Sequence, residues 1–319
     1  MKAFVKEKYG GPEVLQLEEV DFPKLQDGHV IVKIFANSAN PADWHILRGT
    51  PILARLAFGL FKPKEKILGA DFAGVVEQVG KNVKRFTVGD KVFGESLNPG
   101  VFAEYACVAE NICALIPEGL KFPEMACAPI AGITALQALV THGQIKKGET
   151  VLINGAAGGV GHFAVQIAKE YGAHVTAVCS DKNTEFVKSL GADNVIAYDK
   201  ENIHVHTGKY NLVVDVHGNL TFQDFKRMGH RGVMVGFTGM GLMLSVLIKK
   251  AFSKFQLIQF TATANSKDLE MLANLLKESK IRVHIERVFP YHQIPEAIGF
   301  IESMRTQGKV AMIWSGSGE

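Results

Sequence analysis

Residues 151–180 constrain the fold of this chain more than any other segment. They read VLINGAAGGVGHFAVQIAKEYGAHVTAVCS: an apolar run, a glycine-rich turn, a stretch with apolar residues at helical spacing, and a second apolar run. In a dinucleotide-binding fold, glycines are needed where the backbone approaches a pyrophosphate and where the next helix packs on the sheet. The first N–H groups of that helix then bind the phosphates. The order strand, glycine turn, helix and strand therefore predicts such a fold.

The turn matches the pattern G-x-G-x-x-G at two of its three glycine positions. Ala156 stands at the first position, while Gly158 and Gly161 fill the second and third. So short a motif is weak by itself, but its place between two apolar runs strengthens the interpretation. The alternative is a tight turn that binds no ligand.

The end of the second apolar run bears on the choice of cofactor. An enzyme that uses NAD carries Asp or Glu about 20 residues after the turn, where the carboxylate accepts a hydrogen bond from the ribose 2′-hydroxyl. Here Ser180 and Lys182 lie in that region. Because a hydroxyl and a cation can bind a 2′-phosphate, they favour NADPH over NADH. Asp181 is an argument against this interpretation, and Lys182 could instead be an ordinary surface lysine.

The pattern of apolar and polar residues changes at two places along the chain. Residues 1–125 contain short apolar or alternating runs separated by Gly, Pro and Asn, as in all-β structure. From about residue 148 to 263, six candidate strands alternate with helical stretches, which predicts an α/β fold with a doubly wound, six-stranded parallel sheet. An amphipathic helix and a strand–helix–strand tail follow, and we expect this tail to complete the first domain.

Composition argues against several classes of function. The 319 residues carry a net charge of only +3 and no run of Lys or Arg, which argues against nucleic-acid binding. No apolar stretch approaches the roughly 20 residues of a membrane-spanning helix, and the charged N-terminus has no signal-peptide core, so we expect a cytoplasmic protein. The four cysteines form no C-x-x-C pair and are predicted to be ordinary, partly buried thiols.

Motifs along nearly the whole chain resemble the medium-chain dehydrogenase/reductases, and within them the quinone oxidoreductase-like proteins. In chain order the motifs are GGPEVL, NPADWHILRG, LGADFAGVVEQVG, VGDKVFG, FAEYACV, GITALQAL, INGAAGGVG, LGADNVIAYD and IPEAIGFIESMRTQGKV. The resemblance implies a GroES-like catalytic domain of residues 1–125 and 264–319, a Rossmann domain of residues 126–263 that binds NADP(H), and an active site in the cleft between them. It also implies a homodimer or homotetramer, often paired through the last Rossmann strands.

The same resemblance implies which residues contact the cofactor. Gly158, Gly159 and Val160 would contact the diphosphate, and Ser180, Lys182 and Tyr198 the 2′-phosphate and adenosine. Thr134, His217, Gly236 and Phe237 would lie at the nicotinamide end, and Lys309 is a contact from the closing motif. Apart from Thr134, the residues of the nicotinamide end follow strands whose carboxyl ends should face the ring.

The residues that would bind zinc are missing. Alcohol dehydrogenases of this superfamily hold a catalytic zinc ion with Cys and His, but here Asn40 stands at the place of the first Cys and Ala70 at that of the His. Residues 94–102 also lack the cysteine-rich loop of the structural zinc, so we expect no metal. Without a Lewis acid to stabilise an alkoxide, oxidation of simple alcohols is disfavoured. Hydride transfer to an electrophilic acceptor, such as a quinone or an α,β-unsaturated carbonyl compound, remains easy.

One loop offers candidates for the catalytic groups. Asn40 could donate a hydrogen bond to a carbonyl oxygen or to the nicotinamide amide, or it could only shape the loop before Pro41. His45 could relay a proton, although a half-exposed structural histidine is the simpler interpretation. Trp44 could stack on a quinone, but we favour a place in the core. The apolar residues 51–61 could form a wall over the acceptor site or a plain buried helix.

The sequence thus predicts a zinc-independent, NADPH-dependent enzyme that transfers a hydride to a quinone or a similar electrophilic carbonyl compound. An NADPH-dependent alkenal/enone reductase is the first alternative. An enoyl-thioester reductase is less favoured, because it would benefit from a tyrosine proton donor and no tyrosine stands on an obvious active-site loop. The second alternative is a relative that binds NADPH without turnover.

Overall fold

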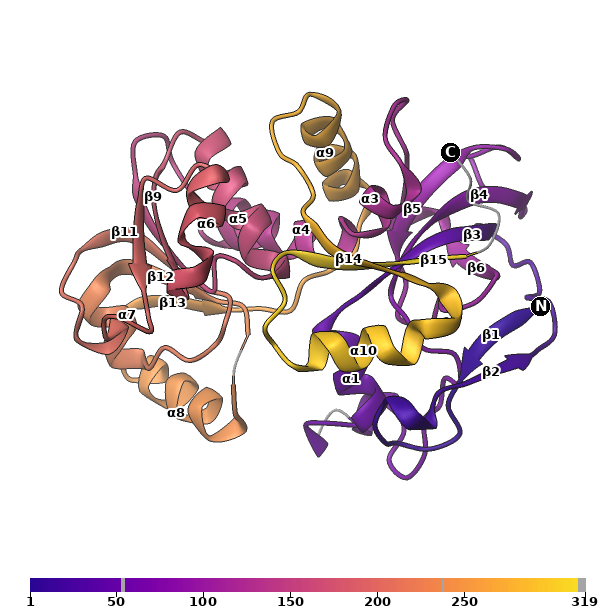
Figure 1. Ribbon diagram of the computed structural model, residues 1–319, viewed down its shortest axis with the longest axis horizontal. Coiled ribbons are helices and arrows are strands. Elements are labelled where there is room, and N and C mark those ends of the chain that lie inside the picture. Colours follow the sequence, from indigo (N-terminus) through magenta and orange to yellow (C-terminus); the bar gives the residue numbers. More distant parts are fainter. Residues whose placement is uncertain (53–54, 237, 315–319) are drawn as a thin grey trace. The chain divides into compact units, whose positions relative to one another are not determined.

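The computed structural model describes residues 1–52, 55–236 and 238–314 (Figure 1). By its internal contacts the chain divides into two compact units. The first unit comprises Met1–Ala131, Ala264–Ser279 and Val283–Glu319, and the second unit comprises Gly132–Thr263 and Lys280–Arg282.

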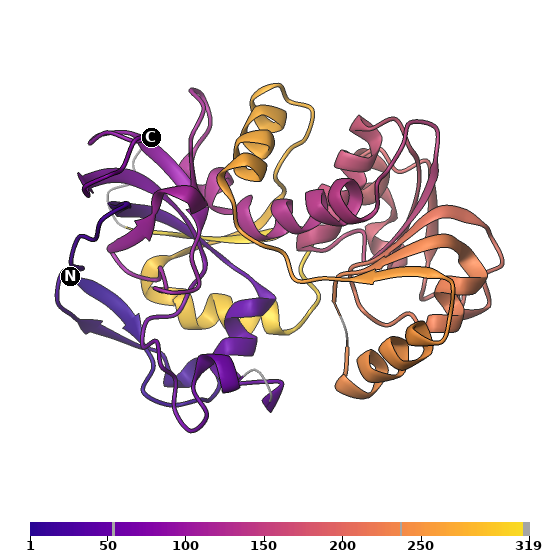
Figure 2. The same cartoon turned by 180° about the vertical axis from the view of Figure 1, so that it is seen from behind.

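A six-stranded, wholly parallel sheet forms the centre of the second unit. Its strand order is β10-β9-β8-β11-β12-β13, with helices on both faces (Figures 1 and 2), so the predicted doubly wound sheet is confirmed. The strands are β8 (Thr150–Asn154), β9 (His174–Cys179), β10 (Asn194–Ala197), β11 (Tyr210–Asp215), β12 (Gly229–Met234) and β13 (Gln256–Gln259). In β8, Val151, Leu152 and Ile153 are all fully buried, as expected of a parallel strand covered on both faces.

Helices connect the parallel strands of the second unit. They are α5 (Gly159–Glu170), α6 (Thr184–Ser189), α7 (Phe222–Met228) and α8 (Met240–Ala251), with single 3₁₀ turns at Asp181–Asn183 and Ile203–Val205. Helix α4 (Pro129–Leu136) leads into this unit and continues as a π-helical turn, Gln137–His142. Because the strand order reverses between β8 and β11, the crossover helices before and after this point cover opposite faces of the sheet.

The glycine turn between β8 and α5 has a steric cause. Gly155 has a φ of +85°, a conformation that favours glycine. A Cβ added to Gly161 would lie 2.1 Å from the carbonyl oxygen of Gly155 and 2.7 Å from the Cα of Ala156. Gly158 differs, because its added Cβ would meet only the Gly155 oxygen, at 3.6 Å. Gly161 is therefore required for packing, whereas Gly158 leaves open space beside the start of the helix.

A mostly antiparallel sheet, which includes the C-terminal strands β14 and β15 as its one parallel pair among the described residues, forms the main part of the first unit. It has seven strands in the order β14-β15-β3-β4-β5-β7, with β6 also pairing with β3, and a separate hairpin joins β1 and β2. The strands are β1 (Lys2–Val5), β2 (Gln16–Glu19), β3 (His29–Ala39), β4 (Asp71–Val79), β5 (Lys91–Glu95), β6 (Tyr105–Ala109), β7 (Cys113–Leu115), β14 (Ile285–Pro290) and β15 (Lys309–Ile313). Strand β15 pairs antiparallel with β3, so the tail of the chain is built into this sheet.

Short helices surround this sheet. They are α1 (Pro41–Arg48), α2 (Arg55–Phe58), α3 (Phe122–Ala126), α9 (Ser266–Lys277) and α10 (Ile294–Glu302), with single 3₁₀ turns at Pro12–Val14, Glu110–Ile112 and Tyr291–Gln293. The core joins sheet and helix residues, among them Phe72, Phe102, Ile298 and Met312. Helix α10 contacts both α1 and β15, which holds the C-terminal segment against the N-terminal part of the unit.

A substitution at Gly161 tests the packing of the glycine turn. We expect Gly161→Ala to lower the thermal unfolding midpoint, because the new methyl group would overlap backbone atoms, and overpacking of this kind costs about 1–3 kcal/mol. Gly241→Ala in α8 is the control, since nothing lies within 4 Å of its added Cβ, and its midpoint should stay the same or rise slightly. Equal midpoints for the two variants, measured by circular dichroism, would contradict this account.

Candidate active site

Strand register gathers polar residues from distant parts of the chain at one end of the first unit's sheet. Ser38 on β3 is the partner of Asp71 on β4, and Asp71 is the partner of Glu95 on β5. Residues directly opposite each other in an antiparallel pair point to the same face, so the carboxyl groups of Asp71 and Glu95 share a face. On the other side of β3, Val310 pairs with Ala39, which brings Lys309 beside Asn40. We call Asn40, Asp43, Asp71, Glu95 and Lys309 the buried polar cluster.

The Asn40 side chain is held by protein partners at both ends. Its Oδ1 accepts a hydrogen bond from Lys309 Nζ at 2.5 Å. Its Nδ2 donates to Asp71 Oδ2 at 2.8 Å and, more weakly, to the Ser38 carbonyl oxygen at 3.4 Å. An amide has two N–H hydrogens, and these contacts use both. From the sequence we expected the Asn40 amide to donate to a substrate carbonyl or to the nicotinamide amide. In the structure its hydrogen bonds go to protein groups instead.

Lys309 is the positive charge of the cluster. Its side chain is 3% exposed, and its Nζ lies 3.4 Å from Asp71 Oδ2 in addition to its bond to Asn40. The sequence predicted Lys309 as a cofactor contact, and that prediction is not tested. In this structure its ammonium group holds Asn40 and Asp71 together.

The carboxyl groups of the cluster are unusual acids. Burial raises the pKa of Asp43 to about 8, against the opposing effect of a 2.7 Å hydrogen bond from the Asn40 backbone N–H. Burial, together with the charges of Asp71 and Asp43, raises the pKa of Glu95 to about 8. Among the described residues, neither Asp43 Oδ1 nor Glu95 Oε2 has a hydrogen-bond partner. Since unbalanced buried charge is costly, we infer that the cluster retains a proton near neutral pH.

The cluster does not fit a catalytic zinc ion. The family resemblance puts Asn40 and Ala70 at positions where zinc-dependent relatives would carry ligands. Ala70 is fully buried and has no ligand atom, and the Lys309 ammonium group bonded to Asn40 would repel a divalent cation at this point. Over residues 1–52, 55–236 and 238–314, no three His, Cys, Asp or Glu side chains come together in a way that could hold a metal ion.

His45 and Trp44 lie on α1 and stack on each other, with ring centroids 3.6 Å apart. His45 is half-buried, and its Nδ1 lies 3.1 Å from the carbonyl oxygen of Thr50. Burial lowers the pKa of His45, so the ring is mostly neutral at pH 7. Trp44 packs, partly buried, against the core, as the sequence favoured. The role of His45 as a proton relay stays a prediction.

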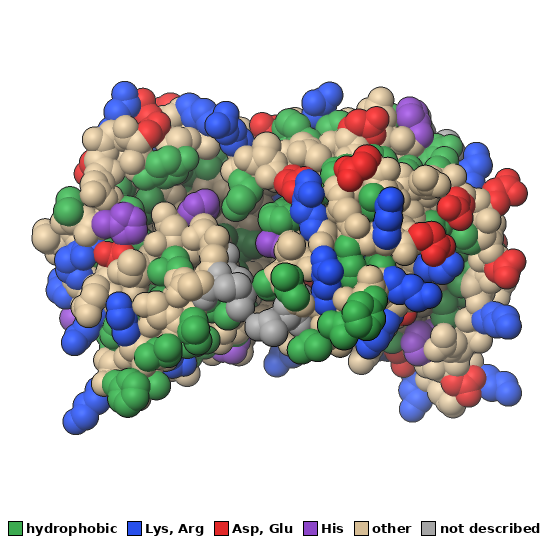
Figure 3. Space-filling view, turned by 90° about the horizontal axis from the view of Figure 1, so that it is seen from below, with side chains coloured by type: hydrophobic (Ala, Val, Ile, Leu, Met, Phe, Trp, Pro, Cys, Tyr) green, Lys and Arg blue, Asp and Glu red, His purple; other side chains and the backbone are tan. Residues whose placement is uncertain are grey.

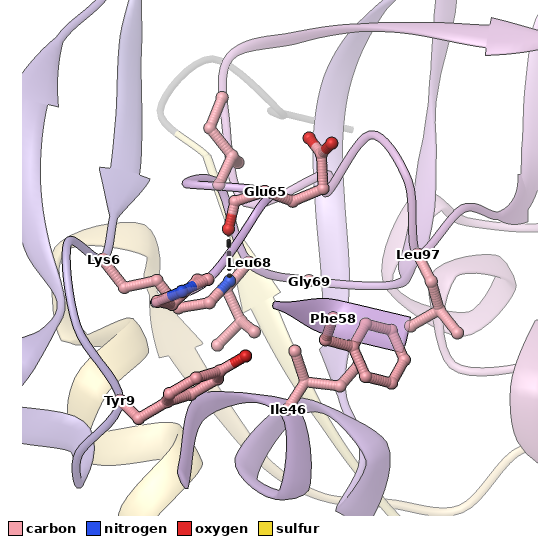
Figure 4. A pocket seen from close by; sticks show the side chains of 10 residues that line it. Lys6, Tyr9, Ile46, Phe58, Glu65, Leu68, Gly69 and Leu97 are labelled. Atoms are coloured by element: carbon pink, nitrogen blue, oxygen red, sulfur yellow. Dashed lines mark hydrogen bonds between the residues drawn. The ribbon is translucent and has the colours of Figure 1, made fainter. Parts of the chain in front are cut away.

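A small pocket opens in the first unit beside the cluster (Figure 4). Its lining is mostly apolar and consists of Lys6, Tyr9, Ile46, Phe58, Pro63, Glu65, Ile67, Leu68, Gly69 and Leu97. Phe58 comes from the apolar stretch 51–61, of which residues 53–54 lie outside the described residues. Phe61 is 90% exposed and Leu56 is also exposed, so this stretch is not a plain buried helix. Sequence reasoning missed Lys6, which directly follows a buried apolar strand.

In the second unit, the predicted diphosphate residues lie at the start of a helix. Gly158 is the N-cap of α5, without a side-chain cap, and Gly159 and Val160 are its first two residues. The first N–H groups of a helix have no partner inside it, and together with the helix dipole they form a site for anions. Open space beside Gly158 fits the approach of a diphosphate. This observation supports the fit of a dinucleotide to the turn.

The residues predicted for the 2′-phosphate and adenosine follow β9 and β10. Ser180 comes directly after β9, Lys182 is exposed, and Tyr198 is 57% exposed. Asp181, the argument against NADPH, has its carboxylate 3.5 Å from Lys200 Nζ. That partner reduces the negative charge that Asp181 would present to a phosphate.

The residues predicted for the nicotinamide end are only partly described. Thr134 is buried on α4, whereas His217 is exposed after β11 and Gly236 follows the neighbouring strand β12. Phe237 lies outside the described residues. At the carboxyl ends of β8 and β11, Asn154 Nδ2 donates to Asp215 Oδ1 at 2.7 Å, a contact that sequence reasoning missed.

A variant at Glu95 tests the protonation of the cluster. Because the pKa of Glu95 is raised in the folded protein, its contribution to stability is present at low pH and is lost as the pH rises toward about 8. We expect Glu95→Gln to remove this loss, so that relative to wild type it gains at least about 1 kcal/mol of stability between pH 5 and pH 8. Urea unfolding at both pH values measures this gain, and Glu77→Gln, an exposed position on β4, is the control. Equal pH dependence in wild type and Glu95→Gln would show that Glu95 is ionised in the folded protein.

Comparison with known proteins identifies two families along the chain. Residues 26–118 match the alcohol dehydrogenase GroES-like domain, and residues 190–312 match a family described as zinc-binding dehydrogenase. The chloroplast envelope quinone oxidoreductase homolog of Arabidopsis thaliana is 36% identical, over 93% of both chains. The NADPH-dependent alkenal/one oxidoreductase of the same plant is 32% identical, over 98% of this chain and 79% of the relative.

Solved structures agree with these relatives. The quinone oxidoreductase from Coxiella burnetii has a TM-score of 0.88 at 30% identity and covers 98% of this chain and 99% of its own. The Escherichia coli quinone oxidoreductase, solved with NADPH, has a TM-score of 0.81 at 25% identity and covers 98% of this chain and all of its own. This chain therefore belongs to the quinone oxidoreductase-like branch of the medium-chain dehydrogenase/reductases and is an oxidoreductase of that family.

Proposed function

We propose that the protein is a zinc-independent, NADPH-dependent oxidoreductase that transfers a hydride to a quinone or a similar electrophilic carbonyl acceptor. The observation that carries this proposal is the bond of the Lys309 ammonium group to Asn40, the residue that the family resemblance puts at a zinc-ligand position. Without a Lewis acid at this point, an acceptor must be electrophilic before it binds. Quinones and enones meet that condition because their reduction spreads the new charge over a conjugated system.

NADP(H) fits the second unit. We propose that Gly158, Gly159 and Val160 bind the diphosphate, and that Ser180, Lys182 and Tyr198 bind the 2′-phosphate and adenosine. Thr134, His217, Gly236, Phe237 and Lys309 complete the proposed contacts. When bound, the reduced nicotinamide supplies a hydride. The Escherichia coli quinone oxidoreductase, which has the same fold and was solved in complex with NADPH, supports this assignment.

Replacement of Lys182 tests the choice of cofactor. We expect Lys182→Ala to weaken NADPH binding about tenfold or more, because a charged hydrogen bond to phosphate is worth about 1.5–3 kcal/mol, and to leave NADH binding unchanged. Lys188→Ala is the matched control, since this exposed lysine is bonded to Glu185 on α6. Fluorescence titration with both cofactors measures the change. An equal effect on NADPH and NADH would place Lys182 outside the 2′-phosphate site.

Two other functions have specific support. The relatives named NADPH-dependent alkenal/one oxidoreductase and 2-methylene-furan-3-one reductase favour reduction of an enone double bond, with the same fold and cofactor. The buried partners of Asn40 favour the other alternative, a protein that binds NADPH without turnover, because they occupy an amide that was expected to face a ligand. In this proposal Asn40 positions Lys309, and His45 is kept as a candidate relay.

Turnover by the purified protein after treatment with a chelator tests the proposed function. We expect NADPH oxidation with 1,4-benzoquinone or cyclohexenone, at rates that the chelator does not change and that exceed those with NADH. The faster acceptor selects between quinone and enone reduction. Binding of NADPH without oxidation by either acceptor would favour the non-catalytic alternative, and loss of activity on chelation would mean that the enzyme depends on a metal ion.

We also propose the limits of the two domains and the assembly of the protein. We keep residues 1–125 and 264–319 as the catalytic domain and residues 126–263 as the cofactor domain. The edge strand β13, the exposed Leu244 and Ile248 of α8, and the exposed Phe252 directly after α8 support a homodimer or homotetramer, since such surfaces favour association. Figure 3 shows hydrophobic side chains among Lys and Arg on the face seen from below.

A cytoplasmic location stays a prediction, because several relatives are named as chloroplast proteins. In the part of the chain that the structure describes, no helix is long and apolar enough to cross a membrane.

A further inference from the structure

The strand order of the second unit's sheet reverses between β8 and β11. Strands β9 and β10 lie on one side of β8, whereas β11, β12 and β13 lie on the other. In open parallel sheets, ligands bind outside the carboxyl ends of the strands at such a reversal. The two segments that leave these ends are the glycine turn after β8 and residues 216–220 after β11, which we call the β11 loop. The β11 loop is therefore placed to meet a cofactor bound at the glycine turn.

Asp215, the last residue of β11, fixes the conformation of the β11 loop. Its carboxylate is fully buried. Oδ1 accepts hydrogen bonds from the Gly218 N–H at 2.8 Å and from Asn154 Nδ2 at 2.7 Å, and Oδ2 accepts one from the Leu220 N–H at 2.9 Å. An ionised carboxylate accepts at both oxygens, whereas an amide has only one oxygen. Asparagine at this position would therefore lose at least one of these bonds.

Asn154, the last residue of β8, connects the β11 loop to the glycine turn. Its carbonyl oxygen accepts hydrogen bonds from the N–H groups of Val216 at 3.0 Å and His217 at 3.3 Å. Its Nδ2 also donates to Asn219 Oδ1 at 2.7 Å. The next residue along the chain is Gly155, where the glycine turn begins. These bonds hold the β11 loop at a fixed position beside that turn.

His217 packs against the glycine turn and is exposed. A Cβ added to Gly155 would lie 3.1 Å from the His217 backbone nitrogen and 3.2 Å from its Cβ. The His217 ring has no hydrogen bond to another described residue. The segments 155–161, 216–221 and 235–239, which follow β8, β11 and β12, contain no Lys or Arg, and His217 is their only basic residue. Its ring is thus the basic group that these segments offer to an anion.

The strand order also indicates which half of the cofactor would meet His217. The residues proposed for the 2′-phosphate and adenosine follow β9 and β10, and those proposed for the diphosphate follow β8. A dinucleotide that crosses the strand ends in this direction would next reach β11. The nicotinamide half would therefore lie at the β11 loop, and its phosphate is the group that a histidine N–H binds most strongly.

We propose that Asp215 is a positioning residue, which with Asn154 holds the β11 loop so that the His217 ring donates a hydrogen bond to the phosphate of the nicotinamide half of NADPH. This inference rests on the proposed function, because it requires NADPH at the glycine turn. Asp215 acts through His217, since its own carboxylate is buried and bonded to protein groups.

Binding of two ligands by isothermal titration calorimetry tests the contact. NADPH has both halves of the dinucleotide, whereas adenosine 2′,5′-bisphosphate lacks the nicotinamide half. We expect His217→Ala to weaken NADPH binding about tenfold or more, as for other hydrogen bonds to a charged group, and Asp215→Asn to weaken it at least about threefold. Both variants should bind adenosine 2′,5′-bisphosphate within about twofold of wild type.

A double variant separates positioning from a general loss of structure. If Asp215 acts through His217, Asp215→Asn/His217→Ala should bind NADPH within about twofold of His217→Ala alone. Asp193→Asn is the matched control, because the Asp193 carboxylate also accepts a hydrogen bond from a backbone N–H, that of Val175 at 2.7 Å, but at the amino ends of β9 and β10. This control should keep the NADPH affinity of wild type even where its thermal unfolding midpoint falls.

Multiplied effects in the double variant, or equal weakening of both ligands, would overturn the proposal. His217→Ala decides the contact if Asp215→Asn does not fold by circular dichroism, since His217 is exposed. If wild type oxidises NADPH but His217→Ala binds it equally well, the inference fails while the proposed function stands. If NADPH binds through His217 but neither 1,4-benzoquinone nor cyclohexenone is reduced, the proposed function fails and the inference stands.

Discussion

The contact of Lys309 with Asn40 and Asp71 connects three strands of the first unit, β15, β3 and β4, at a point closed to solvent. A charge buried in this way is stable only if its partners stay in place, because removal of one partner leaves an uncompensated charge in a medium of low polarity. The register of β15 on β3 is therefore tied to the position of a single ammonium group. In this way the C-terminal strand becomes an integral part of a sheet whose other strands, apart from β14, come from the first 115 residues.

The same contact decides the chemistry that the site can support. The Lys309 ammonium group neutralises nearby carboxylates but cannot polarise a substrate as strongly as a divalent cation does. Three buried carboxyl groups, Asp43, Asp71 and Glu95, and two buried amines, Lys6 and Lys309, then share the charge of this region. A proton on one carboxyl group would make the five groups neutral together. The positive charge of Lys309 and the burial of these carboxyl groups are thus linked, and our proposed function depends on the same groups.

The second unit follows from more local constraints. Its glycine turn is required by the contact between Gly161 and the backbone at Gly155 and Ala156, all within seven residues of one another. The strands on either side are short apolar runs covered on both faces, and the connections between them are helices. Such features depend on residues that are close together in the sequence. For this reason the six-stranded sheet and the place of its glycine turn were predictable from the sequence.

The sequence by itself determined the α/β class, the parallel sheet and the family, since all of these rest on contiguous runs and motifs such as INGAAGGVG. It also marked Asn40 and Ala70 as replacements for metal ligands. It did not reveal that Asn40 is bonded to Lys309, or that Asp71, Glu95 and Lys6 are buried near the same point. No local pattern marks these residues, because each is a single polar or charged residue in an otherwise ordinary strand or loop. The register of β3, β4, β5 and β15 brings Asn40, Asp71, Glu95 and Lys309 together, and register is decided by the packing of the whole sheet.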